Sequence, residues 1–241
     1  MNGPKIIFRI PIFGGIPVTE TIVNCWIVMA VVIVISIWLG YGLKIRPESK
    51  KQIVAEKLVG MLYNLVEDTM GKKFSSFAPY IGALFTMSIT GSLSSLFGLR
   101  PYTADLSTTL SWAVLTSVMV WVFSIKANGF KGWLKGFAEP VPFILPINII
   151  GEIANPISMS FRHFGNIAAG MVITSLVYGG LATLSQTVLS FIPNTFINSI
   201  PIFQLGIPAL LSIYFDLFGS FLQAFIICML TMVNLSNTSK D

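Results

Sequence analysis

The feature that most constrains the fold of this chain is a series of long stretches without Asp, Glu, Lys, Arg or His. They cover residues 21–43, 74–99, 106–125, 164–215 and 217–239. A helix needs about 20 mostly apolar residues to cross the ~30 Å hydrocarbon core of a bilayer. Only 10% of the 241 residues are charged, whereas soluble domains carry about 25%. The sequence therefore predicts an integral membrane protein.

The last two uncharged stretches predict helices of unusual length. The helix-breaking run at 191–194 divides the stretch 164–215, which leaves helices over about 147–190 and 202–235. Helices this long exceed the bilayer core, so they must tilt strongly, kink or lie across it. No alternating pattern of barrel strands recurs. We expect an all-α membrane protein with about five to six transmembrane or intramembrane helices, forming one domain over 1–241.

The distribution of positive charge predicts an orientation. Segment 44–73 holds seven Lys and Arg residues and segment 126–135 holds three, whereas only Lys5, Arg9 and Arg100 fall on the opposite side. The positive-inside rule places the basic segments in the cytoplasm. Five crossings then put the N-terminus outside and the C-terminus in the cytoplasm. The start of the chain lacks the pattern of a cleaved signal or transit peptide, which favours a bacterial plasma membrane.

A few charged residues remain within the apolar region, and Arg162 is the most informative of them. An Arg at the centre of a membrane costs roughly 2.5–3.5 kcal/mol on insertion scales and does not deprotonate. Its neighbours at helical spacing form one polar or small stripe, which must face protein or water: Asn155, Ser158, Asn166 and Ala169. An alternative is an Arg that reaches the membrane interface or closes a structural ion pair with Glu152.

A second polar stripe follows the last helix. Ser212, Asp216, Ser220 and Gln223 recur at spacings of four, four and three. Two such stripes predict a buried hydrophilic path in which Glu152 and Asp216 take up and release protons. Asp216 could instead be a structural carboxyl that stays protonated.

Two further polar residues have simpler interpretations. His163 follows Arg162 and points about 100° away on a helix; it is either part of the path or an interhelical or headgroup-level hydrogen-bonding residue. Asp105 precedes a predicted helix and is interpreted as its N-cap.

Several function classes are excluded by what the sequence lacks. A single His and two Cys, Cys25 and Cys228, cannot build a His/Cys metal cluster or a disulfide framework. Motifs for phosphate-binding loops, zinc proteases and serine hydrolases do not occur, and we expect no cofactor and no catalytic chemistry. A secondary transporter or channel that binds an anionic substrate at Arg162 remains an alternative, although no internal repeat is found. A structural membrane scaffold is another.

One segment resembles a known family. Residues 142–170, PFILPINIIGEIANPISMSFRHFGNIAAG, are similar to the signature of subunit a of F-type ATP synthases. Two other stretches agree, PYTADL at 101–106 and FLQAF at 221–225. The resemblance implies a stator subunit of a rotary motor, beside a ring of c subunits and held by b-type stalk subunits. It also implies two offset proton half-channels, and a hairpin of the last two helices against the ring.

The resemblance assigns roles residue by residue. Arg162 matches the essential arginine that faces the ring carboxylate, and Asn166 and Gln223 match polar positions beside it. Asp216 and Glu152 match a titratable relay group and an acid of one access path. Many relatives carry a carboxylate where Gly170 and Met171 stand here; we hypothesise that Asp216 replaces it across the hairpin. At His163 the family pattern has an apolar residue. The sequence leaves open whether the coupling ion is H⁺ or Na⁺, and which half-channel Glu152 serves.

Overall fold

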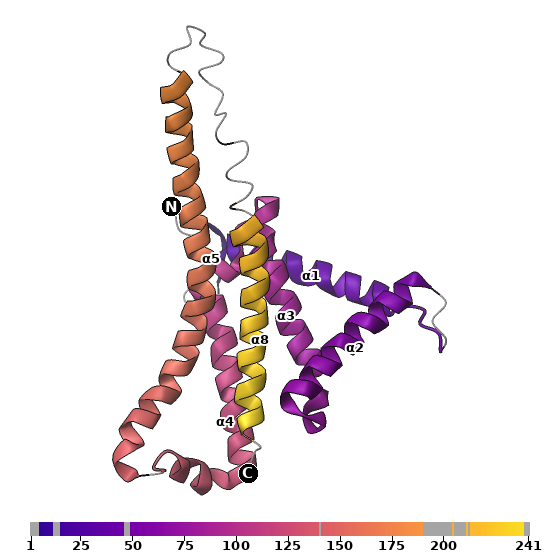
Figure 1. Ribbon diagram of the computed structural model, residues 1–241, viewed down its shortest axis with the longest axis vertical. Coiled ribbons are helices and arrows are strands. Elements are labelled where there is room, and N and C mark those ends of the chain that lie inside the picture. The colour runs from indigo at the N-terminus through magenta and orange to yellow at the C-terminus, as the bar shows by residue number, and fades with distance from the viewer. Residues whose placement is uncertain are drawn as a thin grey trace.

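The computed structural model describes residues 5–11, 15–45, 49–139, 141–189, 204, 211 and 213–238. Within these residues the chain is almost entirely helical (Figure 1). The long helices are α1 (Glu20–Gly40), α2 (Lys50–Met70), α3 (Ala78–Leu93), α4 (Leu106–Gly136), α5 (Leu145–Leu189) and α8 (Gly219–Asn237). Short helices are η1 (Lys72–Phe77), η2 (Ser94–Phe97), η3 (Tyr102–Ala104), η4 (Pro142–Ile144) and the π-helix η6 (Ile213–Phe218).

The prediction of an all-α membrane protein is confirmed. Among the described residues, five helical stretches are long and apolar enough to cross a membrane. They are Glu20–Gly40, Lys72–Phe97, Leu106–Gly136, Pro142–Val188 and Asp216–Asn237. The first long C-terminal helix, expected over about 147–190, is α5. The second is described from Ile213 to Asn237; the predicted break at 191–194 and Ser212 lie outside the described residues.

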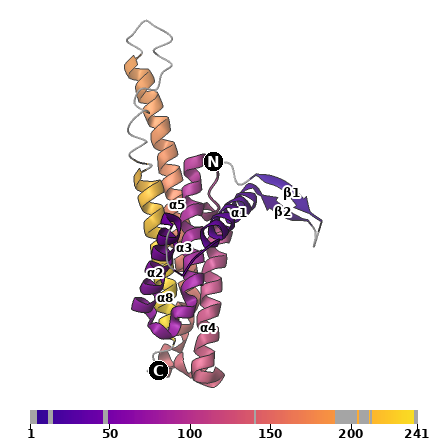
Figure 2. The same ribbon diagram turned by 90° about the vertical axis from the view of Figure 1, so that its right-hand side faces the viewer.

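A short β-hairpin near the N-terminus was not expected from the sequence. β1 (Ile6–Ile10) pairs antiparallel with β2 (Ile16–Thr19), with Arg9 opposite Pro17 and Ile10 opposite Ile16. The hairpin extends from the start of α1, away from the other helices (Figure 2). Its residues lack the strict polar–apolar alternation of a half-buried strand, which explains why the pattern was not recognised.

Capping residues fix where the central helices begin. Asp105 is the N-cap of α4, as predicted: its carboxylate accepts hydrogen bonds from the Ser107 backbone N–H at 3.3 Å and from the Ser107 hydroxyl at 3.0 Å. Thr21 of α1 also donates to Asp105, at 3.0 Å. The same carboxylate therefore starts one helix and holds a second against it. Near the other end of α4, Gly129 has φ +70°, a left-handed conformation that kinks the helix.

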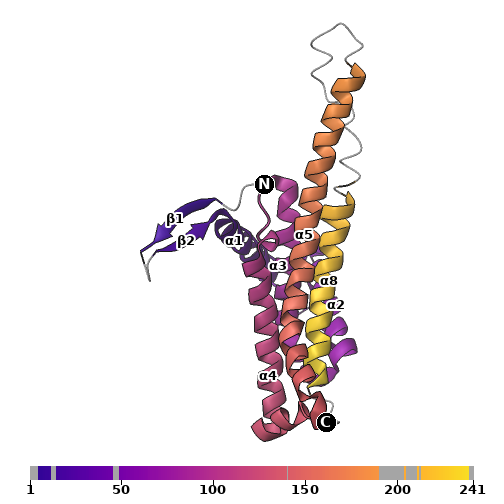
Figure 3. The same cartoon turned by 90° about the vertical axis from the view of Figure 1, so that its left-hand side faces the viewer.

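The core lies where α3, α4, α5 and α8 pack side by side, with the end of α2 against them (Figures 1 and 3). The buried apolar residues at its centre come from all five helices and η1: Val66, Met70, Phe74, Ala78, Ile81, Leu84, Ala113, Met159, Ile227, Cys228, Met232 and Leu235. Most of the basic segment 44–73 is helical, as α2. Only the last turns of α2 enter the core, because Ile53 and Leu58 are exposed whereas Val66 and Met70 are buried.

The two C-terminal helices run side by side in opposite directions (Figures 1 and 3). The 45 residues of α5 correspond to about 67 Å at about 1.5 Å per residue, more than twice the ~30 Å bilayer core. A helix of that length fits within a bilayer only when it is strongly tilted. Pro156 inside α5 also removes the hydrogen bond to the Glu152 carbonyl, a cause of the bend seen in the N-terminal part of α5 (Figure 1).

Candidate functional site

Arg162 stands on the outward face of α5. Every position of the predicted stripe is exposed: Asn155, Ser158, Arg162, Asn166 and Ala169. The buried residues of the same helix lie on an adjoining face, about 100° around the helix from the stripe: Pro156, Met159, Ser160, His163 and Ile167. The described helices thus cover the face of α5 that carries His163, whereas the stripe with Arg162 and apolar residues such as Ile157 and Phe161 stay exposed.

Asn166 connects this stripe to α8. Its amide Nδ2 donates to the backbone oxygen of Gly219 at 3.5 Å. A Cβ on Gly219 would lie 3.3 Å from that Nδ2, so a glycine permits the close approach. Because the two helices are antiparallel, this contact sets the register between them. Arg162, four residues before Asn166, lies level with Gln223, and Ala169, three residues after Asn166, lies level with Asp216.

Asp216 and Gln223 occupy different environments on the α8 side. Asp216 lies in η6, is half-buried, and accepts a hydrogen bond from the hydroxyl of Ser95 in η2 at 3.4 Å. Gln223 is only 4% exposed. Between them the hydroxyl of Ser220 is fully buried and has no hydrogen-bond partner among the described residues. That Asp216 replaces a carboxylate missing from the position of Gly170 or Met171 stays a hypothesis.

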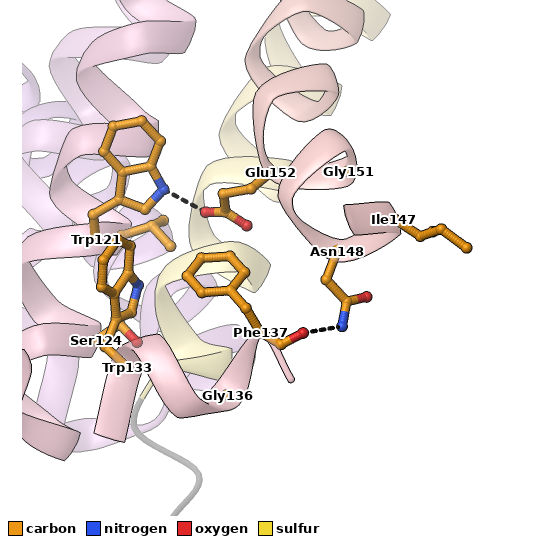
Figure 4. Close-up of a pocket in the computed structure, with 10 residues that line it drawn as sticks. Trp121, Ser124, Trp133, Gly136, Phe137, Ile147, Asn148, Gly151 and Glu152 are labelled. Carbon is orange, nitrogen blue, oxygen red and sulfur yellow. Dashed lines mark hydrogen bonds between the residues drawn. The ribbon is translucent and has the colours of Figure 1, made fainter. Parts of the chain in front are cut away.

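Glu152 lies on α5 before the stripe begins, on an adjoining face that packs against α4. Its carboxylate accepts a hydrogen bond from the indole Nε1–H of Trp121 (Figure 4). Both residues line a cavity of about 610 Å³, which Ser124 and Asn148 also line. The Asn148 amide donates to the backbone oxygen of Phe137 at 2.9 Å and so ties the start of α5 to the end of α4. Glu152 is therefore a half-buried carboxylate in a partly polar cavity, bound to α4 rather than placed beside Arg162.

His163 points into the bundle. It is fully buried, its Nε2 lies 3.5 Å from the Ser88 hydroxyl of α3, and its ring packs edge-on against Trp112 of α4 with centroids 5.9 Å apart. Its Nδ1 has no hydrogen-bond partner in the described part of the chain. The structure thus separates His163 from the outward stripe that carries Arg162.

The two carboxylates flank the arginine along the hairpin. Glu152 lies ten residues before Arg162, which is about 15 Å along a helix, and Asp216 lies level with a position seven residues after it, about 10 Å away. Glu152 lies at the end of the bundle where α4 ends, in the same cavity as Gly136 and Phe137. Asp216 lies at the other end of the bundle, next to η2. The arrangement places one carboxyl group on each side of Arg162 along the hairpin.

Sequence reasoning missed two partners of these carboxylates, Trp121 and Ser95. Both lie within apolar stretches where an isolated Trp or Ser is common, and no spacing rule links them to Glu152 or Asp216. Among the described residues, no group of three or more His, Cys, Asp or Glu is arranged to hold a metal ion.

Comparison with known proteins adds an independent line of evidence. The sequence model of the family described as ATP synthase A chain matches residues 22–236. A protein of Propionigenium modestum named "ATP synthase subunit a, sodium ion specific" is 33% identical over 273 residues, covering 100% of this chain and 86% of that protein. The ATP synthase subunit a of Moorella thermoacetica is 31% identical over 226 residues, covering 93% of this chain and 92% of that protein. The chain therefore belongs to the ATP synthase A chain family, as the resemblance of residues 142–170 had indicated.

Proposed function

We propose that Arg162 is the stator charge of this subunit and that Glu152 and Asp216 serve access paths on either side of it. The family assignment gives the setting: subunit a is the non-catalytic, ion-translocating stator of the membrane sector and works with the c-ring and the rest of the ATP synthase. The observation that carries the proposal is the exposed position of Arg162, midway along a polar stripe on α5 whose residues are all exposed.

The proposed role of Arg162 is electrostatic. Two opposite charges about 4 Å apart interact by about 4 kcal/mol at an effective dielectric constant of about 20. When a ring carboxylate passes Arg162, an interaction of this size favours its ionised form and releases the proton that it carries. A fixed guanidinium also repels protons, which blocks direct leakage between the two access paths.

Glu152 and Asp216 serve two different access paths, one on each side of the membrane. Glu152 lies near Gly136 and Phe137, on the side of the bundle that follows the basic segment 126–135. The positive-inside rule makes that side cytoplasmic, so we assign Glu152 to the cytoplasmic access path and Asp216 to the outer one. The same charge distribution supports an external N-terminus, a cytoplasmic C-terminus and a location in a bacterial plasma membrane.

The remaining polar residues have supporting roles in this proposal. Asn166 and Gln223 line the hairpin beside Arg162, and the Asn166–Gly219 contact keeps α5 and α8 in register. The buried contacts of His163 with Ser88 and Trp112 favour an interhelical role over a relay role. Contacts across the whole set of central helices support a single domain.

We assign the proton as the coupling ion, because Glu152 and Asp216 are groups that take up and release protons. The Propionigenium modestum relative is named sodium ion specific, so the assignment needs its own test. ATP-driven acidification of vesicles should persist in sodium-free buffer. An absolute requirement for Na⁺ would overturn the proton assignment and leave the role of Arg162 standing.

The decisive experiment uses membrane vesicles that contain the whole complex with Arg162→Ala. We expect normal assembly, loss of ATP-driven pumping, and altered passive proton flux after the soluble head is removed. Arg9→Ala, which removes an exposed cation from β1, is the matched control and should pump normally. Normal pumping by an assembled Arg162→Ala complex would refute the proposal.

The competing interpretations receive no support. A transporter that binds an anionic substrate at Arg162 would belong to a different family from the one that matches residues 22–236. A purely structural scaffold would tolerate Arg162→Ala in the assembled complex, so the same experiment tests it.

A further inference from the structure

A second cavity, of about 460 Å³, lies between η1, α4 and the end of α8. Two lysines from different elements line it, Lys73 of η1 and Lys126 of α4, together with the hydroxyl residues Ser76 and Thr238. None of its described lining residues is acidic. Positive charge and hydroxyl groups from separate elements therefore line one cavity, which shares no residue with the site around Arg162.

The position of this cavity relative to the apolar stretches is informative. Lys73 immediately precedes the uncharged stretch 74–99, and Lys126 immediately follows the uncharged stretch 106–125. Thr238 is the second-last residue of the uncharged stretch 217–239. Three spans thus begin or end at the same level, which marks the edge of the hydrocarbon core. Phospholipid headgroups lie at this level.

Aromatic rings form the apolar side of the cavity. Phe77 packs edge-on against Phe123 with ring centroids 5.2 Å apart, and Phe74 lies 6.0 Å from Phe77. The Lys126 ammonium lies 5.7 Å from the centre of the Phe123 ring, which holds the charge at the rim of the apolar wall. A ligand that fits must combine an anionic group with an apolar portion.

We propose that this cavity binds the phosphate of an anionic phospholipid, with Lys73 and Lys126 contacting the phosphate and the acyl chains following the phenylalanine rings. Its volume corresponds to about fifteen waters at ~30 Å³ each, enough for a phosphodiester and a glycerol unit. The Thr238 hydroxyl already donates to the Leu235 carbonyl at 2.7 Å and so presents an acceptor. That acceptor suits a headgroup with its own hydroxyls, as in phosphatidylglycerol. Basic pockets between helices on the cytoplasmic side are a recurring form of lipid recognition.

A free phosphate shares the anionic chemistry but not the apolar part. The phenylalanine rings favour a phospholipid over inorganic phosphate, since inorganic phosphate gains no binding free energy from apolar contact. The assignment of the lipid to the cytoplasmic leaflet rests on the orientation proposed above. The binding of the lipid to the cavity does not depend on that orientation.

The test measures phosphatidylglycerol binding to the purified whole complex in detergent by titration and native mass spectrometry. Lys73→Gln/Lys126→Gln should weaken binding about 30-fold, since each lysine near a membrane surface contributes a factor of about five. Lys131→Gln/Lys135→Gln is the matched control: it removes the same total charge from the part of α4 that follows Lys126, outside the cavity, and should leave binding within about twofold of the parent. Lys73→Arg/Lys126→Arg should retain binding, which separates lost charge from lost folding.

Three outcomes would overturn the proposal. The first is equal weakening by both glutamine pairs, which would mean general surface attraction. The second is displacement of the lipid by millimolar inorganic phosphate, which would mean a free-anion site. The third is unchanged binding in Lys73→Gln/Lys126→Gln. Arg162→Ala should leave lipid binding intact, so failure of this inference and failure of the stator proposal are distinguishable.

Discussion

Replacing Gly91 with alanine should destabilise the protein, because the added methyl group would collide with Tyr102. A Cβ built on Gly91 lies 2.7 Å from both Cε2 and the hydroxyl oxygen of the Tyr102 ring, well inside van der Waals contact. Tyr102 cannot easily move: it is fully buried, its hydroxyl donates to the Met87 carbonyl at 2.6 Å, and its ring packs edge-on against Trp112. Trp112 in turn contacts His163, so the strain reaches the helix that carries Arg162.

The magnitude follows from two opposing effects. Overpacking of a well-packed core costs about 1–3 kcal/mol, and replacing a helical glycine by alanine returns up to about 1 kcal/mol. Because Tyr102 is held in place, the upper part of that range, about 2–3 kcal/mol, applies here. The net loss of about 1–2 kcal/mol lowers the melting temperature by about 2–8 °C for a chain of this size. Gly60→Ala in α2 is the matched control, since a Cβ there meets nothing within 4 Å; it should raise the melting temperature slightly.

The assay can use the buried thiol of Cys228, which is 1% exposed. In a Cys25→Ser background, labelling by a thiol-reactive dye during heating reports when the core around Cys228 opens. Truncation of Tyr102 to leucine removes the ring that the new methyl group strikes, so adding Gly91→Ala to Tyr102→Leu should cost little further stability. The reasoning is refuted if Gly91→Ala melts at or above the temperature of the parent, or if its cost is the same in both backgrounds.

Other predictions test the site. Asp216→Asn should abolish proton-driven ATP synthesis in an assembled complex, because the amide cannot carry a proton; synthesis near the parent rate would remove Asp216 from the relay. Trp121→Phe deletes the hydrogen bond to Glu152, and since such bonds to charged groups contribute about 1.5–3 kcal/mol, passive proton flux should fall about tenfold, whereas Trp133→Phe in the same cavity should not change it. His163→Leu should keep ATP-driven pumping but change the melting temperature; loss of pumping by a stable, assembled variant would make His163 part of the path.

The sequence alone was sufficient to predict the class of fold and to single out the candidate site residues. Uncharged stretches locate the membrane spans because an unpaired charge in hydrocarbon has a high free-energy cost. For the same reason, each charge that remains within a span indicates a candidate site residue. The spacing of Asn155, Ser158, Arg162 and Asn166 defines one face of a helix, and the structure leaves that face exposed. The N-cap role of Asp105 was likewise local, depending only on the residues that follow it.

The tertiary structure decided which groups meet. The Asn166–Gly219 contact and the antiparallel packing of α5 and α8 set the register that brings Gln223 level with Arg162. The partners of the carboxylates, Trp121 and Ser95, lie 31 and 121 residues away in the chain from Glu152 and Asp216. Sequence periodicity describes one helix at a time, because it follows from the rotation per residue about a single axis. Contacts between helices depend on how side chains of several helices fill the same space, and only the packed structure specifies that.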